Sequence, residues 1–246
     1  MSTTLRNVKS KTPNQQRIFE LFDAGHNLYI KGTAGTGKSF ISMYLCLDEL
    51  LNHQSEFNKL IIVRSTVPTR KQGFLPGDDS EKNEVFEIPY SIICNKLIAD
   101  NSNGNTYKDL KNRKLIEFMS TSYLRGQTFE KALILVDEVQ NFNDGEINTV
   151  MTRLGTDCQI IICGDTAQND LQYMHEESCI LRLDQTIPKM PSFRTVVMTN
   201  DDICRNPVVR EWIIARSKVS NTTPQFLRER TIDYTADAPS NITPGD

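Results

Sequence analysis

The sequence has 246 residues, of which 28 are Lys or Arg and 31 are Asp or Glu, so its formal net charge at pH 7 is −3. A hydrophobic fraction of 38% and a charged fraction of 24% are ordinary for a folded globular protein and exclude a wholly disordered chain. The slightly acidic balance also excludes a strongly basic nucleic-acid coat protein, although it is compatible with a local basic groove.

The predicted elements alternate between helices and apolar strands along the chain. A first helix is predicted over 15–22, following Thr12 and Pro13. The side chain of Thr12 can cap the helix, and Pro13 suits the first helical position. A short strand over 27–31 follows and ends at a glycine-rich turn. The remaining elements, in order, are a helix over 39–51, a strand over 60–63, helical periodicity over 84–99, a loop over 100–105, strands over 115–119 and 133–136, a helix over 146–154, strands over 159–163 and 194–198, and a helix over 208–216. This alternation predicts an α/β fold whose mostly parallel sheet is covered by helices on both faces.

The composition changes near Ser217, where Ser, Thr, Asn and Pro accumulate and the apolar periodicity fades. We therefore expect a folded domain over 1–216 and a tail over 217–246, which is either a dispensable terminus or a segment docked on another surface.

The apolar runs and the cysteines indicate the cellular compartment that we expect for this protein. The longest apolar runs, such as 133–136, are far shorter than the roughly 20 residues of a membrane-spanning helix. Residues 1–11 are polar and basic and lack the apolar core of a secretory signal. The 6 cysteines are scattered, without a CxxC pair or a zinc-like spacing with His. We expect a cytoplasmic protein with reduced thiols, no structural zinc and no contact with a membrane.

The segment between the first strand and the second helix matches the phosphate-loop pattern G-x-x-x-x-G-K-[ST] in full. Its residues are Gly32, Thr33, Ala34, Gly35, Thr36, Gly37, Lys38 and Ser39. The glycines allow successive backbone N–H groups to face phosphate oxygens at the N-terminus of a helix. We expect Lys38 to reach the β- and γ-phosphates of ATP and Ser39 to hold Mg²⁺. The alternative interpretation is a glycine-rich turn with an exposed lysine.

A second acidic motif follows the apolar strand over 133–136. Asp137 and Glu138 come directly after it, at the carboxyl end of the sheet, where ligands bind in open α/β folds. We expect Asp137 to hold Mg²⁺, directly or through water, and Glu138 to polarise the attacking water as general base. A pair that only caps the next helix is the alternative. Beyond the strand over 159–163, Gln168 is placed to contact the γ-phosphate or the attacking water, unless it is a glutamine of a surface turn.

Together these motifs resemble the PhoH family of ATPases, which is related to the motor core of superfamily-one helicases. The resemblance runs from about Thr12 to Val209 and includes, besides the phosphate loop and Arg64, the blocks Thr12-Pro13-Asn14-Gln15, Gly73-Phe74-Leu75-Pro76-Gly77-Asp78, Asp137-Glu138-Val139-Gln140-Asn141, Gly164-Asp165 with Gln168 and Asp170-Leu171, and Asp202-Ile203-Cys204-Arg205-Asn206-Pro207. It implies a RecA-like P-loop NTPase domain in which Gln15 contacts the adenine base. Asn206 replaces the family's His, and Gln172 stands where Pro usually follows, which puts local turns in doubt rather than the ATP site.

Arg205 is a candidate arginine finger, because a guanidinium can neutralise charge on the transferring γ-phosphoryl group. A helicase places this arginine on its second motor domain, whereas the motifs from Gln15 to Arg205 occupy nearly the whole predicted domain. We therefore expect Arg205 to come from the same domain or from a neighbouring copy. The neighbour interpretation predicts a homo-oligomer, such as a six-membered ring, in which Arg205 acts in trans. The alternative is that Arg205 caps a helix or pairs with Asp202.

The leading functional hypothesis is a Mg²⁺-dependent ATPase that binds or remodels RNA or another single-stranded nucleic acid. The predicted nucleic-acid contact is a basic groove, or else only a solvated charged face, formed by Arg64, Arg70, Lys71, Lys108, Lys111, Arg113, Lys114 and Arg125. The alternative function is an ATP-dependent switch or assembly protein that recruits a protein partner. A metabolite kinase is disfavoured by Glu138 and by the lack of a recognisable substrate lid. A chain this compact also suits a phage genome, in which case its location is the host cytoplasm.

Overall fold

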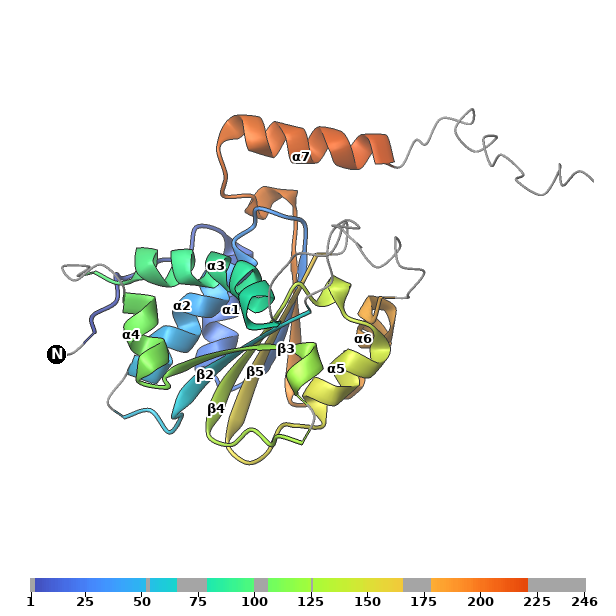
Figure 1. Ribbon diagram of the computed structural model, residues 1–246. Helices are drawn as coiled ribbons and strands as arrows, with labels where there is room; N and C mark the ends of the chain where they lie inside the picture. The colour runs from blue at the N-terminus through green and yellow to red at the C-terminus, as the bar shows by residue number, and fades with distance from the viewer. Residues whose placement is uncertain are drawn as a thin grey trace, which may run out of the picture. The chain divides into compact units, whose positions relative to one another are not determined.

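The computed structural model describes residues 3–51, 54–65, 79–99, 106–124, 126–165 and 178–220 (Figure 1). The chain divides into two compact units, Met1–Asn206 and Pro207–Asp246. The first holds the sheet and the predicted ATP motifs, and the described part of the second is helix α7, Pro207–Ser220. Among the described residues, no helix combines the length and the apolar character that crossing a membrane requires.

The described strands form one six-stranded sheet in the order β3-β2-β4-β5-β1-β6. Their bounds are Asn27–Gly32 for β1, Lys59–Arg64 for β2, Ile116–Ser120 for β3, Ala132–Asp137 for β4, Cys158–Gly164 for β5 and Phe193–Met198 for β6. Every neighbouring pair is parallel, which confirms the predicted parallel sheet, and the register places Arg64 beside Asp137. β5 separates β1, which leads into the phosphate loop, from β4, which ends in the acidic pair.

Helices cover both faces of the sheet, as predicted (Figure 1). The helices of one face are α1 (Pro13–Asp23), α2 (Lys38–Leu51), α3 (Asp79–Leu97) and α4 (Thr106–Asn112), and those of the other are α5 (Asp144–Met151) and α6 (Ile180–Thr186). Leu133 and Leu135 of β4 join the core under the first group, and Ile134 and Val136 join the core under the second. Successive β4 side chains enter opposite cores because side chains alternate across a strand. A strand buried on both faces therefore reads as an uninterrupted apolar run.

The helix boundaries differ from the predicted ones where the local signal is weak. α1 begins at Pro13 as expected, and Thr12 Oγ1 accepts a hydrogen bond from the backbone N–H of Gln15 at 3.3 Å. α3 begins at Asp79, ahead of the predicted start at 84. α4 is an element that the sequence does not predict, because it has 7 residues and is mostly polar. The predicted loop over 100–105 and the tail beyond 220 lie outside the described residues, and the predicted domain limit at 216 stays a prediction.

Candidate functional site

The phosphate loop turns between β1 and α2 on backbone conformations that favour glycine. Gly32, Gly35 and Gly37 have φ angles of 149°, 82° and 87°. A Cβ atom on Gly32 would lie 2.2 Å from the backbone oxygen of Met198, so a side chain there would clash with β6. The Nζ atom of Lys38 donates a hydrogen bond to the carbonyl oxygen of Gly32 at 2.7 Å and holds the ammonium group against the loop. The structure thus confirms the placement of the loop between a strand and a helix.

Ser39 and Asp137 lie side by side at the carboxyl end of the sheet. Ser39 Oγ donates a hydrogen bond to Asp137 Oδ1 at 3.0 Å, and the hydroxyl of Tyr90 donates one to Oδ2 at 3.0 Å. Burial and, after it, the charge of Asp137 raise the pKa of Tyr90 well above its usual range, so the phenol stays protonated. A serine hydroxyl and a carboxylate are hard oxygen ligands, and Mg²⁺ is bound by one or two carboxylates plus substrate phosphates. The donor set at this position therefore fits Mg²⁺.

Glu138 follows Asp137 in a left-handed backbone conformation, with a φ angle of 55°. For a residue other than glycine this conformation costs on the order of 1 kcal/mol, and such strain gathers at functional sites. Burial and then the charge of Asp137 raise the pKa of Glu138, whereas a hydrogen bond from Gln140 and the charges of Arg64 and Lys38 lower it. The carboxylate is thus held between groups that oppose its ionisation and groups that favour it.

Gln140 joins Glu138 to the end of β5. Its Nε2 donates a hydrogen bond to Glu138 Oε2, and its Oε1 accepts one from the backbone N–H of Asp165 at 2.9 Å. Gln140 is 1% exposed, so both ends of its amide are used inside the protein. The end of β5 can lie next to Val139 and Gln140 because Gly164 has no side chain. A Cβ atom on Gly164 would be 2.8 Å from Cγ1 of Val139. The general-base candidate is therefore oriented by the residue two positions after it.

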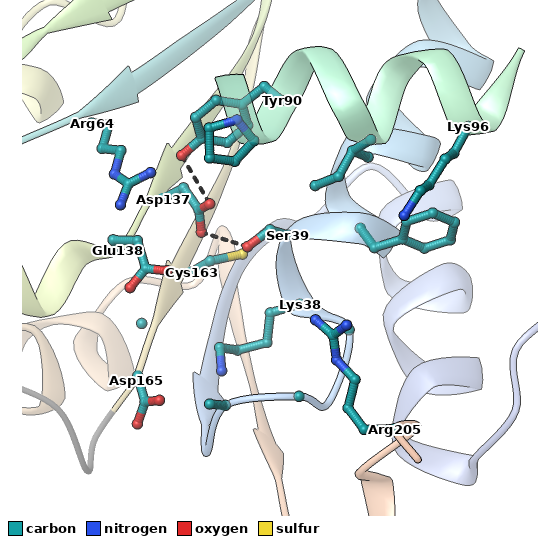
Figure 2. A pocket seen from close by; sticks show the side chains of 17 residues that line it. Lys38, Ser39, Arg64, Tyr90, Lys96, Asp137, Glu138, Cys163, Asp165 and Arg205 are labelled. Carbon is teal, nitrogen blue, oxygen red and sulfur yellow. Dashed lines mark hydrogen bonds between the residues drawn. The ribbon is translucent and has the colours of Figure 1, made fainter. Parts of the chain in front are cut away.

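The side chains of the phosphate loop and the acidic pair line one cavity of about 440 Å³ (Figure 2). Its charged lining residues are Lys38, Arg64, Lys96, Asp137, Glu138, Asp165 and Arg205. A second cavity of about 200 Å³ is lined by Lys9, Lys11, Gln15 and Cys204, among others. Both cavities share walls formed by Gly35, Gly37, Phe40 and Arg205, so they adjoin at the phosphate loop.

Gln15, the expected base contact, lines the second cavity but uses its amide within its own chain. Its Nε2 donates to the carbonyl oxygen of Thr36 at 3.1 Å and to Cys204 Sγ at 3.3 Å. Its Oε1 accepts a hydrogen bond from the backbone N–H of Lys11 at 2.8 Å. The side chain therefore braces the phosphate loop against the segment that carries Arg205, and its contact with an adenine base stays a prediction.

The segment before Arg205 is tied to the start of α1 through Asp202. This buried carboxylate accepts hydrogen bonds from the side chains of Thr12 and Asn14 and from the backbone N–H of Thr199. Burial alone would raise the pKa of Asp202, but these hydrogen bonds outweigh it and lower the pKa. Within the described residues no ion pair joins Asp202 to Arg205, whose side chain lines the cavity instead (Figure 2). That result removes the Asp202 pairing suggested as an alternative for Arg205.

The residues of the expected basic groove are not brought together. Arg64 lines the cavity at the carboxyl end of β2. Arg113 and Lys114 directly precede β3, at the amino-terminal edge of the same parallel sheet, and Lys111 pairs with Glu87 at 2.6 Å. A full strand length separates the two edges, so Arg64 does not lie beside Arg113 and Lys114, and the basic groove as a whole stays a prediction. Four residues expected at the ATP site or in the basic groove lie outside the described residues, namely Gln168, Arg70, Lys71 and Arg125.

The sequence alone does not indicate the roles of three site residues. Tyr90 lies 47 positions before Asp137, and no local pattern indicates that α3 brings its hydroxyl to the end of β4. Gln140 follows the acidic pair closely in the sequence, but its hydrogen bond with Asp165 forms only because the end of β5 lies beside it in the fold. Arg64 belongs to the cavity because β2 and β4 are paired neighbours, an arrangement that the sequence alone does not indicate.

The sequence of the chain is similar to those of one known protein family. The family described as "PhoH-like protein" matches residues 7–217 of the chain. A PhoH-like protein of Synechocystis sp. is 32% identical over 219 residues, which cover 88% of this chain and 64% of that protein. A PhoH-like protein of Bacillus subtilis is 28% identical over 215 residues, which cover 87% of this chain and 65% of that protein. The chain thus spans slightly less than two thirds of the length of these relatives.

Solved structures with similar folds include helicase and terminase chains. The large terminase of a thermophilic bacteriophage, in complex with ADP, has a TM-score of 0.48 and 10% identity over 82% of this chain and 48% of its own. The Pif1 helicase of Candida albicans has a TM-score of 0.40 and 16% identity over 78% of this chain and 40% of its own. With a phosphate loop after β1, an acidic pair after β4 and an all-parallel sheet, the predicted RecA-like α/β P-loop fold is confirmed. The family match, which spans residues 7–217, shows that this chain belongs to the PhoH-like protein family.

Proposed function

We propose that the chain binds ATP with Mg²⁺ and hydrolyses it. The observation that carries this proposal is the 3.0 Å hydrogen bond between Ser39 and Asp137, which joins the two predicted metal ligands beside Lys38. Chance glycine-rich turns do not bring such a serine to a buried carboxylate at the end of another strand. A 440 Å³ cavity that contains these groups and Glu138 supports a triphosphate site.

Each side chain has a task in this proposal. Lys38 and the loop N–H groups bind the phosphates, and Ser39 and Asp137 would hold Mg²⁺, whose charge offsets that of the phosphate oxygens when it is bound. Glu138, oriented by Gln140, accepts the proton of the attacking water. Arg64 lines the cavity from β2 and adds positive charge beside Glu138. The adjoining cavity at Gln15 is the proposed place for the base.

The direct test is hydrolysis of ATP by the purified chain, measured as phosphate release with Mg²⁺ and with excess EDTA. We expect turnover only with the metal. Binding of a fluorescent ATP analogue without phosphate release, together with nucleotide-dependent capture of a protein, would instead favour the ATP-dependent switch.

We also propose that ATP hydrolysis is coupled to binding of RNA or single-stranded nucleic acid, on the basis of family membership. Arg64 lines the cavity proposed for ATP, so this proposal does not depend on Arg64 as a nucleic-acid contact. Hydrolysis should be measured with and without single-stranded RNA across a salt series, since phosphate contacts weaken steeply with salt. Absence of both binding and stimulation at low salt would contradict the coupling. The cytoplasm stays the predicted location.

Replacing Arg205 by Ala is expected to lower ATP turnover by about 10- to 100-fold, the effect of losing one charge-assisted hydrogen bond. Arg205 lines the cavities of its own chain, which supports a contribution from the same domain. Action in trans within a homo-oligomeric ring stays a prediction, and mixing tests it. Equimolar Arg205→Ala and Glu138→Gln chains regain activity only if an arginine from one copy serves the site of another. The mass of the particle with and without ATP reports the oligomer itself.

Replacing Gln140 by Met keeps a side chain of similar length but removes the hydrogen bond to Glu138. Because that bond lowers the pKa of Glu138, its loss raises this pKa, and less of the carboxylate is ionised at a given pH. The acidic limb of the kcat–pH profile is expected to move to higher pH, with rates approaching those of wild type at alkaline pH. Gln127→Ala, at an exposed position, is the control. An unmoved acidic limb in Gln140→Met would contradict the role of Gln140.

A further inference from the structure

The carboxylate of Asp137 is held from two sides by different parts of the chain. Ser39 of α2 donates to one oxygen and Tyr90 of α3 donates to the other, both at 3.0 Å. Asp137 is 4% exposed and Tyr90 is 1% exposed. The phenol of Tyr90 donates this hydrogen bond, and Oδ2 of Asp137 accepts it. The rotation of the Asp137 side chain is therefore fixed by a hydroxyl group that belongs to neither predicted motif.

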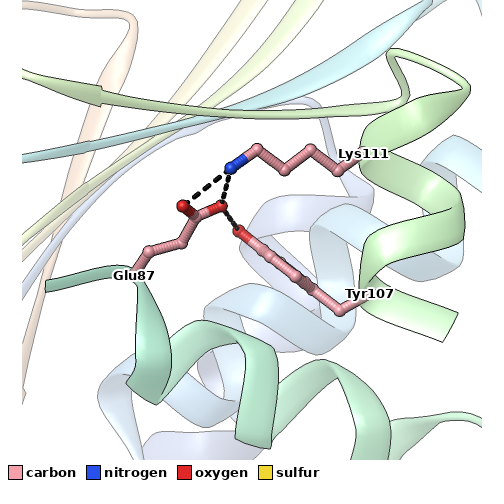
Figure 3. Close-up of polar contacts among 3 residues, drawn as sticks. All are labelled: Glu87, Tyr107 and Lys111. Carbon is pink, nitrogen blue, oxygen red and sulfur yellow. Dashed lines mark hydrogen bonds and ion pairs between the residues drawn. The ribbon is translucent and has the colours of Figure 1, made fainter. Parts of the chain in front are cut away.

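The turn of α3 that carries Tyr90 is itself anchored on both sides. On the side of β3, the ring of Tyr90 packs on Phe118 with a distance of 5.8 Å between ring centres. On the side of α4, Glu87 accepts hydrogen bonds from the hydroxyl of Tyr107 at 2.8 Å and from Lys111 Nζ at 2.6 and 2.7 Å (Figure 3). Glu87 is buried and lies one helical turn before Tyr90. The ring contact with Phe118 and the ion pair of Glu87 with Lys111 are sufficient to hold this turn of α3, and with it the phenol, beside the end of β4.

The anchoring matters because this turn of α3 includes a proline. Pro89 has no backbone N–H, so the helix lacks one hydrogen bond directly before Tyr90. Pro89 also lines the ATP cavity, next to Tyr90. Side-chain contacts to β3 and α4 therefore help to fix this part of α3, where one helical hydrogen bond is missing.

We propose that Tyr90 is a positioning residue for Asp137, and that its hydroxyl sets the affinity of the nucleotide site for Mg²⁺. The inference rests on the proposed function, in which Asp137 is a metal ligand. Partners that orient a metal-ligating side chain commonly change metal affinity or activity by about 10- to 100-fold when they are removed. Without the phenol hydrogen bond, Asp137 can rotate away from Ser39, and both oxygen ligands lose their shared orientation.

Tyr90→Phe tests this with a matched control, Tyr107→Phe. Each change removes one buried hydroxyl that donates to a carboxylate and leaves the aromatic ring in place, but only Tyr90 contacts Asp137. In Tyr107→Phe, Lys111 still satisfies Glu87. Mg²⁺ is titrated into each chain at a fixed concentration of a fluorescent ADP analogue, and half-saturation is read from the signal. Affinity for the analogue in EDTA and thermal unfolding are measured alongside.

We expect Tyr90→Phe to need about 10- to 100-fold more Mg²⁺ for half-saturation, with unchanged affinity for the analogue in EDTA. Tyr107→Phe is expected to behave as wild type. An unchanged Mg²⁺ requirement in Tyr90→Phe, or an equal shift in Tyr107→Phe, would overturn the inference and leave the proposed function standing. A wild-type chain that binds no nucleotide with or without Mg²⁺ would overturn both.

Discussion

Replacing Glu138 by Gln lowers the rate of ATP hydrolysis by about 10²- to 10⁴-fold and leaves ATP binding intact, the loss expected for a general base. A glutamine keeps the side-chain length and an oxygen that can accept the hydrogen bond of Gln140. The change therefore removes the charge and the basicity while the local contact persists. Phosphate release measures the first effect, and binding of a fluorescent ATP analogue measures the second.

The matched control is Glu130→Gln, because Glu130 is an exposed carboxylate that precedes β4 in the sequence and lies outside the cavity lining. It should hydrolyse ATP as wild type does. Near-normal phosphate release by Glu138→Gln would show that another group activates the water, and Asp165, the remaining carboxylate of the cavity lining, would be tested next.

Replacing Lys38 by Ala is expected to weaken ATP binding by on the order of 100-fold, since the variant removes a partly buried charge whose proposed partner is the triphosphate. Hydrolysis is lost in consequence. In the structure the Lys38 ammonium contacts the carbonyl oxygens of Gly32 and Thr33, at 2.7 and 2.9 Å. An alanine also removes the hydrogen bonds that these two carbonyl oxygens accept from the ammonium group. Titration with the fluorescent analogue gives the affinity.

Lys59→Ala serves as the comparison for Lys38→Ala. Lys59 pairs with Glu117 at 3.0 Å and begins β2, at the sheet edge opposite the cavity. Its removal is expected to leave the affinity for nucleotide unchanged. If both lysine variants bind ATP equally well, the phosphate loop is not the nucleotide site.

The sequence predicts the parts of the site whose geometry is local. The order glycine loop, Lys38, Ser39 depends on one strand-to-helix turn, and Asp137 depends on the end of one apolar run, so both patterns can be interpreted without the fold. Contacts between distant elements could not be predicted in this way. Tyr90 reaches Asp137 only because α3 packs over α2 and β3, and Arg64 enters the cavity only because β2 pairs with β4.

The same limit applies to the described cations of the expected basic groove. Lys111 and Arg64 are both cations in the sequence, but their surroundings give them different roles. Lys111 is committed to the buried Glu87, and Arg64 faces Glu138. Charge alone indicates neither partner. Short polar elements such as α4 are missed for a related reason, since their place is decided by the core residues Tyr107 and Leu110 rather than by periodicity.

The hydrogen bonds of the Asp202 carboxylate also limit when the fold can be completed during synthesis of the chain. Its partners Thr12 and Asn14 lie 190 and 188 positions earlier in the chain. Contacts this distant form only after the intervening segments are ordered, because closing a long loop costs entropy. During synthesis, a growing chain therefore carries the phosphate loop and the acidic pair well before Asp202 can accept its hydrogen bonds from Thr12 and Asn14. A chain interrupted before β6 keeps the phosphate loop and the acidic pair but lacks Cys204 and Arg205, which line the adjoining cavity.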